Sequence, residues 1–356
     1  MEMKTRETIG YNGARCGHRI AGRGAWHIML ICLASLLMCA CHQKELVYPA
    51  SSMFDVTVLF DWTYAPDAAP EGMSVVFFPI GGEGRIWRYE LSGRDGGTVS
   101  LPAGSYRMLA FNNDTKYISY DGISHFDTYN AYTFKSAVSW PQSVLETYPE
   151  LDDYIAYHSP DALYCGTAED VSVSLCSVSY RPCDPGADPS DVQIKECGKH
   201  IIRCYPSPRT SKYTCIFRNV VNASGMKRGY CLLSGLAPSD LIAEDILSDA
   251  EGAYAFLAGR RDSDISGSAM AFGASASPMA CQYLYLVAVL SDGKVVAFRY
   301  DVSDQILNSI DKRNVMIIID GVELPEADPT NPDDSPTDFE VAVDDWEMVI
   351  INHVVG

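Results

Sequence analysis

Apolar and polar residues alternate with a period of two along much of this chain, beginning near residue 53. In the first such run the apolar positions are Phe54, Val56, Val58 and Phe60. Alternate side chains of a strand point to opposite faces, so this run predicts a half-buried β-strand. No comparably long run with a helical period occurs in the chain.

Similar short runs follow at intervals of roughly ten residues, separated by Gly and Pro turns, which is typical of an antiparallel sandwich or barrel. In the first half they are 73–78, 85–91, 98–101, 105–111 and 171–180. In the second half they are 201–205, 212–220, 228–234, 269–272, 283–290, 294–300 and 315–319. A βαβ rhythm is missing from the sequence, which argues against a parallel nucleotide-binding sheet. We therefore predict an all-β protein.

The division into domains is predicted from a cluster of prolines. Residues 182–189 hold three prolines and break regular structure, which separates a first domain at 53–190 from a second at 191–352. The irregular, Tyr- and Asp-rich stretch 112–160 is interpreted as an excursion that packs on the first domain. The acidic, Pro-rich segment 325–337 is interpreted as an exposed loop that leads to a terminal strand at 339–351.

A few helices and turns are also expected. Short helices are predicted near 143–147, at 238–249 and at 303–310; in the last, Ser303 is the expected N-cap, and Ile306, Leu307 and Ile310 share one face. The sequence Ser-Asp-Gly at 291–293 predicts a hairpin turn, and the Gly-rich segment 81–84 a hairpin tip.

The first 40 residues are predicted to be a lipoprotein signal peptide. Basic residues precede an apolar run from Ile28 to Ala40, which is too short to span a bilayer but typical of a secretory signal. The run ends at Cys41 and resembles a bacterial lipoprotein box, in which the cysteine is acylated; Cys39, after the bulkier Met38, is the competing nucleophile. Residues 41–52 would then be a linker. An uncleaved signal anchor or an ordinary cleaved signal is the alternative.

The charge balance limits the partners. The chain has 27 Lys and Arg against 46 Asp and Glu, a formal net charge of −19. Nucleic-acid recognition needs clustered basic residues, so no nucleic-acid partner is expected. The expected partners are the membrane, through the lipid anchor, and fimbrial subunits or surface glycans.

Several fragments resemble an uncharacterised Bacteroidales lipoprotein family related to the fimbrillins. They are Val58-Leu59-Phe60-Asp61-Trp62, Pro70-Glu71-Gly72-Met73, Leu101-Pro102-Ala103-Gly104-Ser105-Tyr106, Asn112-Asn113-Asp114-Thr115, Leu232-Leu233-Ser234-Gly235-Leu236-Ala237, Asp301-Val302-Ser303-Asp304-Gln305-Ile306 and Val343-Asp344-Asp345-Trp346. The resemblance implies two tandem transthyretin-like, fimbrillin-like β-sandwiches, a lipid anchor, and a place on the surface of the cell outer membrane or on a pilus.

One departure from that resemblance bears on the role. Major fimbrillin subunits polymerise after a protease cuts at Arg or Lys near the first strand, and a neighbour's strand fills the groove. Here no Lys or Arg occurs between Lys44 and Arg85. An anchor, tip or accessory role is therefore favoured over a stalk-forming one.

The sequence contains none of the catalytic or zinc-binding motifs considered next. Neither a Gly-x-Ser-x-Gly elbow nor a His-Glu-x-x-His motif occurs, and the cysteines lack the Cys-x-x-Cys spacing of zinc sites. We predict no enzyme activity, no catalytic residues, no cofactor and no metal. Cysteines 165, 176, 183, 197, 204, 215, 231 and 281 form structural disulfides or serve as buried thiols, and spacing leaves both open.

The predicted function is display and contact: a lipid-anchored surface protein with a structural, adhesive or pilus anchoring role. The alternative is a glycan-binding lipoprotein that uses the Tyr- and Asp-rich region 112–135. Its candidate contacts are Tyr117, Tyr120, Tyr129 and Tyr132, whose rings can stack on sugars. The competing interpretation is that these tyrosines pin an irregular loop onto the sheet.

Overall fold

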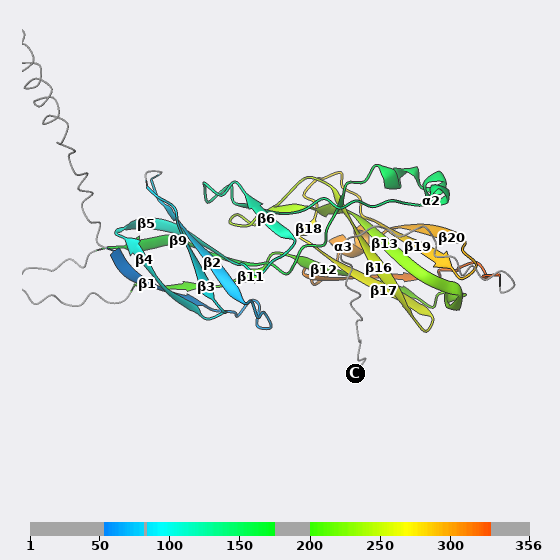
Figure 1. Cartoon of the computed structure of the whole chain (residues 1–356), viewed down its shortest axis with the longest axis horizontal. Coiled ribbons are helices and arrows are strands. Elements are labelled where there is room, and N and C mark those ends of the chain that lie inside the picture. Colours follow the sequence, from blue (N-terminus) through cyan, green and yellow to red (C-terminus); the bar gives the residue numbers. More distant parts are fainter. Residues whose placement is uncertain (1–52, 82–83, 175–199, 329–356) are drawn as a thin grey trace, which may run out of the picture. The chain divides into compact units, whose positions relative to one another are not determined.

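The computed structural model describes residues 53–81, 84–174 and 200–328. The leader, Cys41, the proline cluster 182–189 and the predicted terminal strand 339–351 all lie outside the described residues. The described chain is built of β-strands with two short α-helices, which confirms the all-β prediction (Figure 1).

The first group of strands forms two sheets around one core. The smaller sheet has the order β10 (His200–Cys204), β1 (Met53–Phe60) and β4 (Gly96–Pro102). The larger has the order β11 (Ser207–Pro208), β9 (Tyr164–Val173), β5 (Gly104–Asn112), β2 (Gly72–Pro79) and β3 (Trp87–Ser92). Val56 and Val58 of β1 are fully buried, as the alternation predicts, and pack in a core with Phe77 and Met108.

The second group forms a sheet that closes around its own core. Its path is β20 (Val295–Asp301), β19 (Tyr283–Leu290), β13 (Met226–Ala237), β16 (Gly252–Arg261), β17 (Asp264–Ala271), β12 (Ser211–Arg218) and β21 (Asn314–Asp320). The short strands β18 (Gly273–Ala274) and β8 (Ala156–Tyr157) pair with β13 and β16. Residues from both ends of this path meet in one core cluster, where Phe298 of β20 packs against the group that holds Ile317 of β21.

Most strand pairs are antiparallel, but three are parallel: β1 with β10, β12 with β21, and β8 with β16. Strands β10 and β11 lie beyond residue 190, where the sequence places the domain boundary, yet they pair with β1 and β9. The pairing therefore extends the first group of strands to residue 208. Proline composition cannot reveal this, because the partner of an edge strand depends on contacts distant in sequence.

The predicted helix at 238–249 is wrong. Its residues instead form β14 (Ser239–Leu241) and β15 (Ile246–Leu247), which join β7 (Asn130–Thr133) and β6 (Ile118–Asp121) in a four-stranded sheet. The backbone of Asp240 pairs with Ala131, and Thr133 donates its N–H to the Pro238 carbonyl at 3.1 Å. Cross-strand hydrogen bonds of this kind override local helical propensity.

The excursion at 112–160 packs differently from the prediction. The helix α2 (Gln142–Thr147) forms where the sequence predicts it, and a 3-10 turn, η1 (Pro149–Asp152), follows. Val144 and Leu151 of these elements pack against Tyr285 and Val287 of β19. This part of the excursion thus covers a face of the second sheet, because β19 presents apolar side chains on both faces.

The predicted helix at 303–310 is shorter than expected. Helix α3 ends at Leu307, and of the three residues predicted to share one face only Ile306 is buried. Ser303 does not cap the helix; its hydroxyl accepts a hydrogen bond from the Gln282 N–H at 3.0 Å. The hairpin turn at 291–293 is confirmed, since β19 and β20 pair along their lengths. The strands on either side of the Gly-rich segment 81–84, β2 and β3, also pair, while Gly82 and Glu83 lie outside the described residues.

Candidate functional site

The four candidate tyrosines do not form one exposed surface. Tyr129 is 1% exposed, and its ring lies 5.5 Å from that of Phe111 in a buried cluster that also holds Phe78. Tyr120 packs against the same phenylalanine with ring centroids 4.6 Å apart, and burial raises the pKa of its hydroxyl. These two rings serve the core, as the competing interpretation expects.

The other two tyrosines are half-buried and separate. Tyr117 stacks on His158 with ring centroids 5.2 Å apart, and Tyr132 meets Phe134 edge to face at 6.1 Å. The sequence did not indicate which of the four tyrosine rings would be buried and which would be accessible to solvent. A period-two reading of the short strands β6 and β7 places Tyr129 outside them, so the sequence held no signal for its burial.

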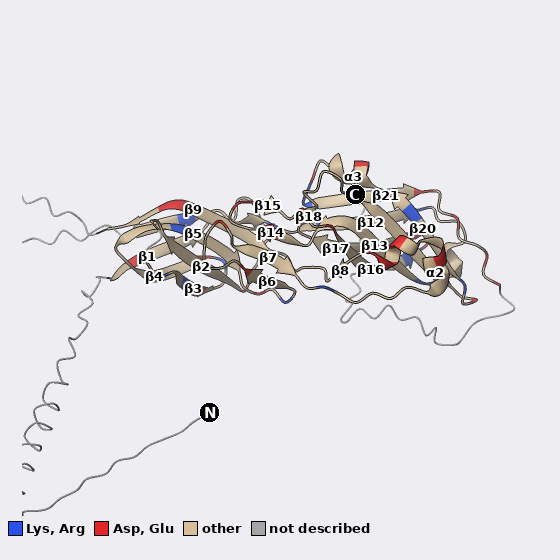
Figure 2. Cartoon of the chain, turned by 90° about the horizontal axis from the view of Figure 1, so that it is seen from above, with Lys and Arg blue, Asp and Glu red and all other residues tan. Residues whose placement is uncertain are grey.

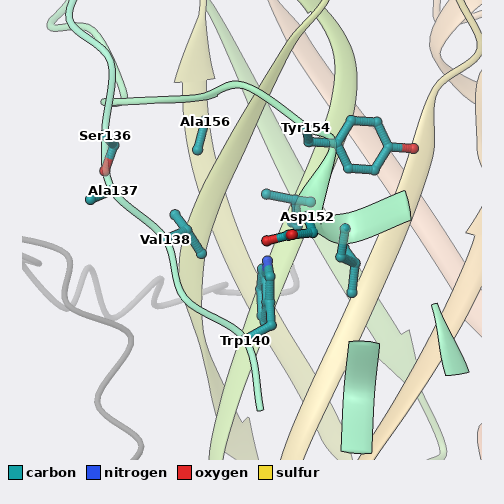
Figure 3. A pocket seen from close by; sticks show the side chains of 9 residues that line it. Ser136, Ala137, Val138, Trp140, Asp152, Tyr154 and Ala156 are labelled. Carbon is teal, nitrogen blue, oxygen red and sulfur yellow. The ribbon is translucent and has the colours of Figure 1, made fainter. Parts of the chain in front are cut away.

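A pocket of about 190 Å³ lies in the excursion, over the face of the second sheet (Figure 3). Its apolar floor includes Leu151 and Leu232, both buried. Trp140, Asp152 and Tyr154 stand around it, and Ser136 lines the opposite side (Figure 3). The sequence alone did not indicate this pocket, because its walls come from segments on either side of α2 and from β13.

A polar network holds one wall of this pocket. The hydroxyls of Tyr154 and Tyr285 lie 3.3 Å apart, and Tyr285 donates a hydrogen bond to the Glu150 carboxylate at 3.0 Å. Arg299 of β20 pairs with the same carboxylate at 2.8 Å. Burial alone would raise the pKa of Glu150, but hydrogen bonds from its own backbone, Tyr285 and Arg299 outweigh burial and lower it. The carboxylate is therefore charged and ties η1 to the sheet.

A second notable group is the buried carboxylate of Asp240 on β14. The side chain is 1% exposed, and neither carboxylate oxygen has a hydrogen-bond partner. Burial raises its pKa to about 6, against the opposing attraction of Arg209. Arg209 is itself nearly buried and forms an ion pair with Asp245. An unpaired buried carboxylate destabilises the folded state when it is charged.

Arg107 of β5 is the centre of a surface ion-pair cluster. Its guanidinium contacts Asp127, Glu169 at 2.6 Å and Glu244 at 3.3 Å, and lies 3.7 Å from the centre of the Phe126 ring. Because the three acids are partly or largely exposed, solvent weakens each pair. The cluster links β5 to Glu169 of β9 (Figure 2) and to the segments that carry Asp127 and Glu244, and its three acids outnumber the single Arg107 cation.

The described cysteines are all free thiols. Cys165, Cys204, Cys215 and Cys231 are buried, and Cys281 is exposed. Burial raises the pKa of the Cys165 thiol to about 12, and it raises the pKa of the other three buried thiols as well. For these four residues the buried-thiol interpretation applies. Cys176, Cys183 and Cys197 lie outside the described residues.

Clustered metal ligands and membrane-spanning helices are absent from the described residues. Within residues 53–81, 84–174 and 200–328, no three His, Cys, Asp or Glu side chains gather as metal ligands would. In the same ranges no helix has the length and apolar character needed to cross a bilayer.

A known protein of Bacteroides ovatus is similar to part of this chain. Over 107 residues the chain is 36% identical to Fim4B of Bacteroides ovatus, a protein assigned as a fimbrium anchoring subunit. That match covers 29% of this chain and 31% of the relative, so the chain aligns with less than a third of that protein's length.

One solved structure shows the same kind of fold. The crystal structure of a Bacteroides ovatus protein assigned as an adhesin aligns with a TM-score of 0.56 at 18% identity, covering 78% of this chain and 94% of that one. The fimbrial anchor protein Mfa2 of Porphyromonas gingivalis aligns with a TM-score of 0.44 at 13% identity, covering 75% and 91%.

A family model described as "Domain of unknown function (DUF5119)" matches residues 40–256. The matched range holds all strands of the first group, the four-stranded sheet, and β8, β12 and β13 of the second group. It thus spans most of the described fold and more than half of the chain, and the protein belongs to the DUF5119 family.

Proposed function

We propose that this protein is an anchoring or accessory subunit of a surface fimbrium, and that it acts by contact rather than by catalysis. The observation that carries the proposal is the 36% identity to a protein assigned as a fimbrium anchoring subunit. The all-β fold, shared with a protein assigned as an adhesin, agrees with it.

The first strand supports an anchoring role over a stalk-forming one. Strand β1 is hydrogen-bonded on both sides, to β10 and to β4, and buries Val56 and Val58 completely. Strand β1 lies within the range between Lys44 and Arg85, which contains no Lys or Arg. A trypsin-like protease therefore has no site next to this strand at which to release it. A strand that stays in place leaves no groove for a neighbour's strand at this position.

A lipid anchor at Cys41 completes the proposal. The family model begins at residue 40, one residue before Cys41, which is where a mature lipoprotein would start. Several acyl chains together hold a protein almost permanently, because each buried methylene contributes about 0.8 kcal/mol. The protein would then sit at the cell outer membrane with its folded part exposed to fimbrial subunits.

The test is to delete the gene in the organism that encodes it and to follow its fimbriae. If the protein is an anchor, fimbriae detach, so their subunits move from the cell fraction to the medium. Restoring the wild-type gene returns them to the cells. Fimbriae that stay on cells in normal number and length after the deletion would contradict the anchoring role.

A further inference from the structure

The pocket beside Trp140 has three polar groups that the fold does not use. Within the described part of the chain, the indole N–H of Trp140, the hydroxyl of Ser136 and the carboxylate of Asp152 all lack a hydrogen-bond partner, although they line one cavity. Tyr154 differs from them, since its hydroxyl pairs with Tyr285. Figure 3 shows the side chains of Asp152 and Trp140 among those that line the cavity.

The floor and walls of this pocket have mixed character. Leu151 and Leu232 are buried beneath it, and Trp140 is half-buried. A ligand that matches has an apolar face for the ring and the floor, and a rim of hydroxyl groups for the carboxylate and the N–H. A pyranose sugar has both.

The volume of the pocket and the charge around it limit the class of ligand. A cavity of 190 Å³ is far larger than one water requires, but below the roughly 300 Å³ of pockets for drug-sized ligands, so it accommodates one ring of a glycan. The rim carries the exposed Asp152, and the chain has a net charge of −19. Both disfavour anionic sugars.

We infer that this pocket binds a single neutral pyranose ring of a glycan, with Trp140 as the stacking platform and Asp152 as the hydroxyl acceptor. Its walls are held in place before any ligand arrives. Ser136 donates its backbone N–H to the Ala156 carbonyl at 2.9 Å, and Glu150, two residues before Asp152, is tied to Arg299. Such preorganisation lowers the entropy cost of binding. The inference does not depend on the fimbrial role.

The experiment uses the full-length protein in a detergent without a sugar headgroup. The probes are the methyl glycosides of glucose, galactose, mannose and N-acetylglucosamine, measured by saturation-transfer NMR and tryptophan fluorescence. We expect at least one of them to bind with a Kd on the order of 1 mM, as suits one ring in an open pocket. N-acetylneuraminic acid, which is anionic, is expected not to bind.

Matched variants locate the site. Asp152→Asn is expected to weaken binding by about fivefold or more, because the charged acceptor is lost. Asp153→Asn, at the adjacent exposed position outside the pocket lining, is expected to leave the Kd within about twofold. Trp140→Phe keeps a ring but removes the N–H, and is expected to bind more weakly, with an unchanged circular dichroism spectrum.

Three results would overturn the inference. They are no binding of any of the four glycosides, equal effects of the Asp152 and Asp153 variants, or preferential binding of N-acetylneuraminic acid. None of these would bear on the fimbrial role, which the release of fimbriae tests separately.

Discussion

At the scale of single residues, Asp240 is an ionisable side chain whose buried environment disfavours its charged form. Its carboxylate is buried without a hydrogen-bond partner, and its pKa is raised to about 6 from the ordinary value of 3.8. Between these two pH values the folded protein binds more protons than the unfolded chain. The free energy of unfolding therefore falls as the pH rises from about 4 to about 6, by about 3 kcal/mol at most.

Asp240→Asn is expected to remove this pH dependence and to stabilise the protein at pH 7, since no charge is buried. Urea denaturation at pH 4, 5, 6 and 7 measures it. Asp249→Asn, at an exposed position on the same segment, is the control and is expected to keep the wild-type slope. Parallel pH profiles for Asp240→Asn and the wild type would show that the carboxylate is not buried unpaired.

Residue type alone shows that the tyrosine rings can stack, but it does not show which of them are buried. Tyr129 lies in a buried cluster and Tyr117 stacks at the surface on His158. Both belong to one Tyr-rich stretch with no periodic pattern. Burial there depends on which distant side chains, such as Phe78 and Phe111, reach the ring.

At the scale of elements, strand β13 contains a bulge that depends on one glycine. The register of β13 against β16 shifts between Ser234 and Leu236, and Gly235 between them has a φ of +73°. A Cβ added there would lie 2.4 Å from the Cys281 carbonyl oxygen. Both the backbone conformation and the close approach therefore require glycine.

Gly235→Ala is expected to destabilise the protein by about 1–3 kcal/mol, because a non-glycine residue is strained at this φ. Gly259→Ala in β16 is the control, since an added Cβ there meets nothing within 4 Å. It is expected to be neutral or stabilising by up to about 1 kcal/mol. Thermal unfolding compares the two. Equal unfolding midpoints for the two variants would contradict the predicted strain at Gly235.

Helix α3 offers a second pair of neighbouring positions. Ile306 is 2% exposed and belongs to the core of the second sheet, whereas Leu307 is 60% exposed. Ile306→Ala is expected to cost about 2–5 kcal/mol through the cavity that it leaves. Leu307→Ala is expected to change stability by less than about 0.5 kcal/mol. Chemical denaturation of both variants checks this, and a similar loss in the two would contradict the orientation of the helix.

At the scale of the whole molecule, the proposed role depends on attachment at Cys41. Cys41→Ala is expected to abolish incorporation of an alkyne-labelled palmitate and to release the protein from the membrane fraction. Cys39→Ala, at the competing cysteine, is expected to leave labelling unchanged. Labelling that survives in the first variant and disappears in the second would move the anchor to Cys39, and labelling of neither variant nor wild type would exclude acylation.

The sequence by itself determined the class of fold. Period-two runs such as that of β1, and turns such as 291–293, depend on local geometry: alternate side chains face opposite sides of a strand, and Asp-Gly favours a tight turn. These signals span a few residues and need no partner that is distant in sequence. They can therefore be recognised from the sequence alone.

Only the tertiary structure decided which strands became neighbours and which side chains stayed free. The helix expected at 238–249 became β14 and β15 because β7 offered cross-strand partners, and β10 joined β1 from beyond the expected boundary. The Trp140 pocket likewise combines the excursion with Leu232 of β13. Such outcomes depend on the competition between distant partners for the same hydrogen bonds and apolar surface, and the order of residues does not display that competition.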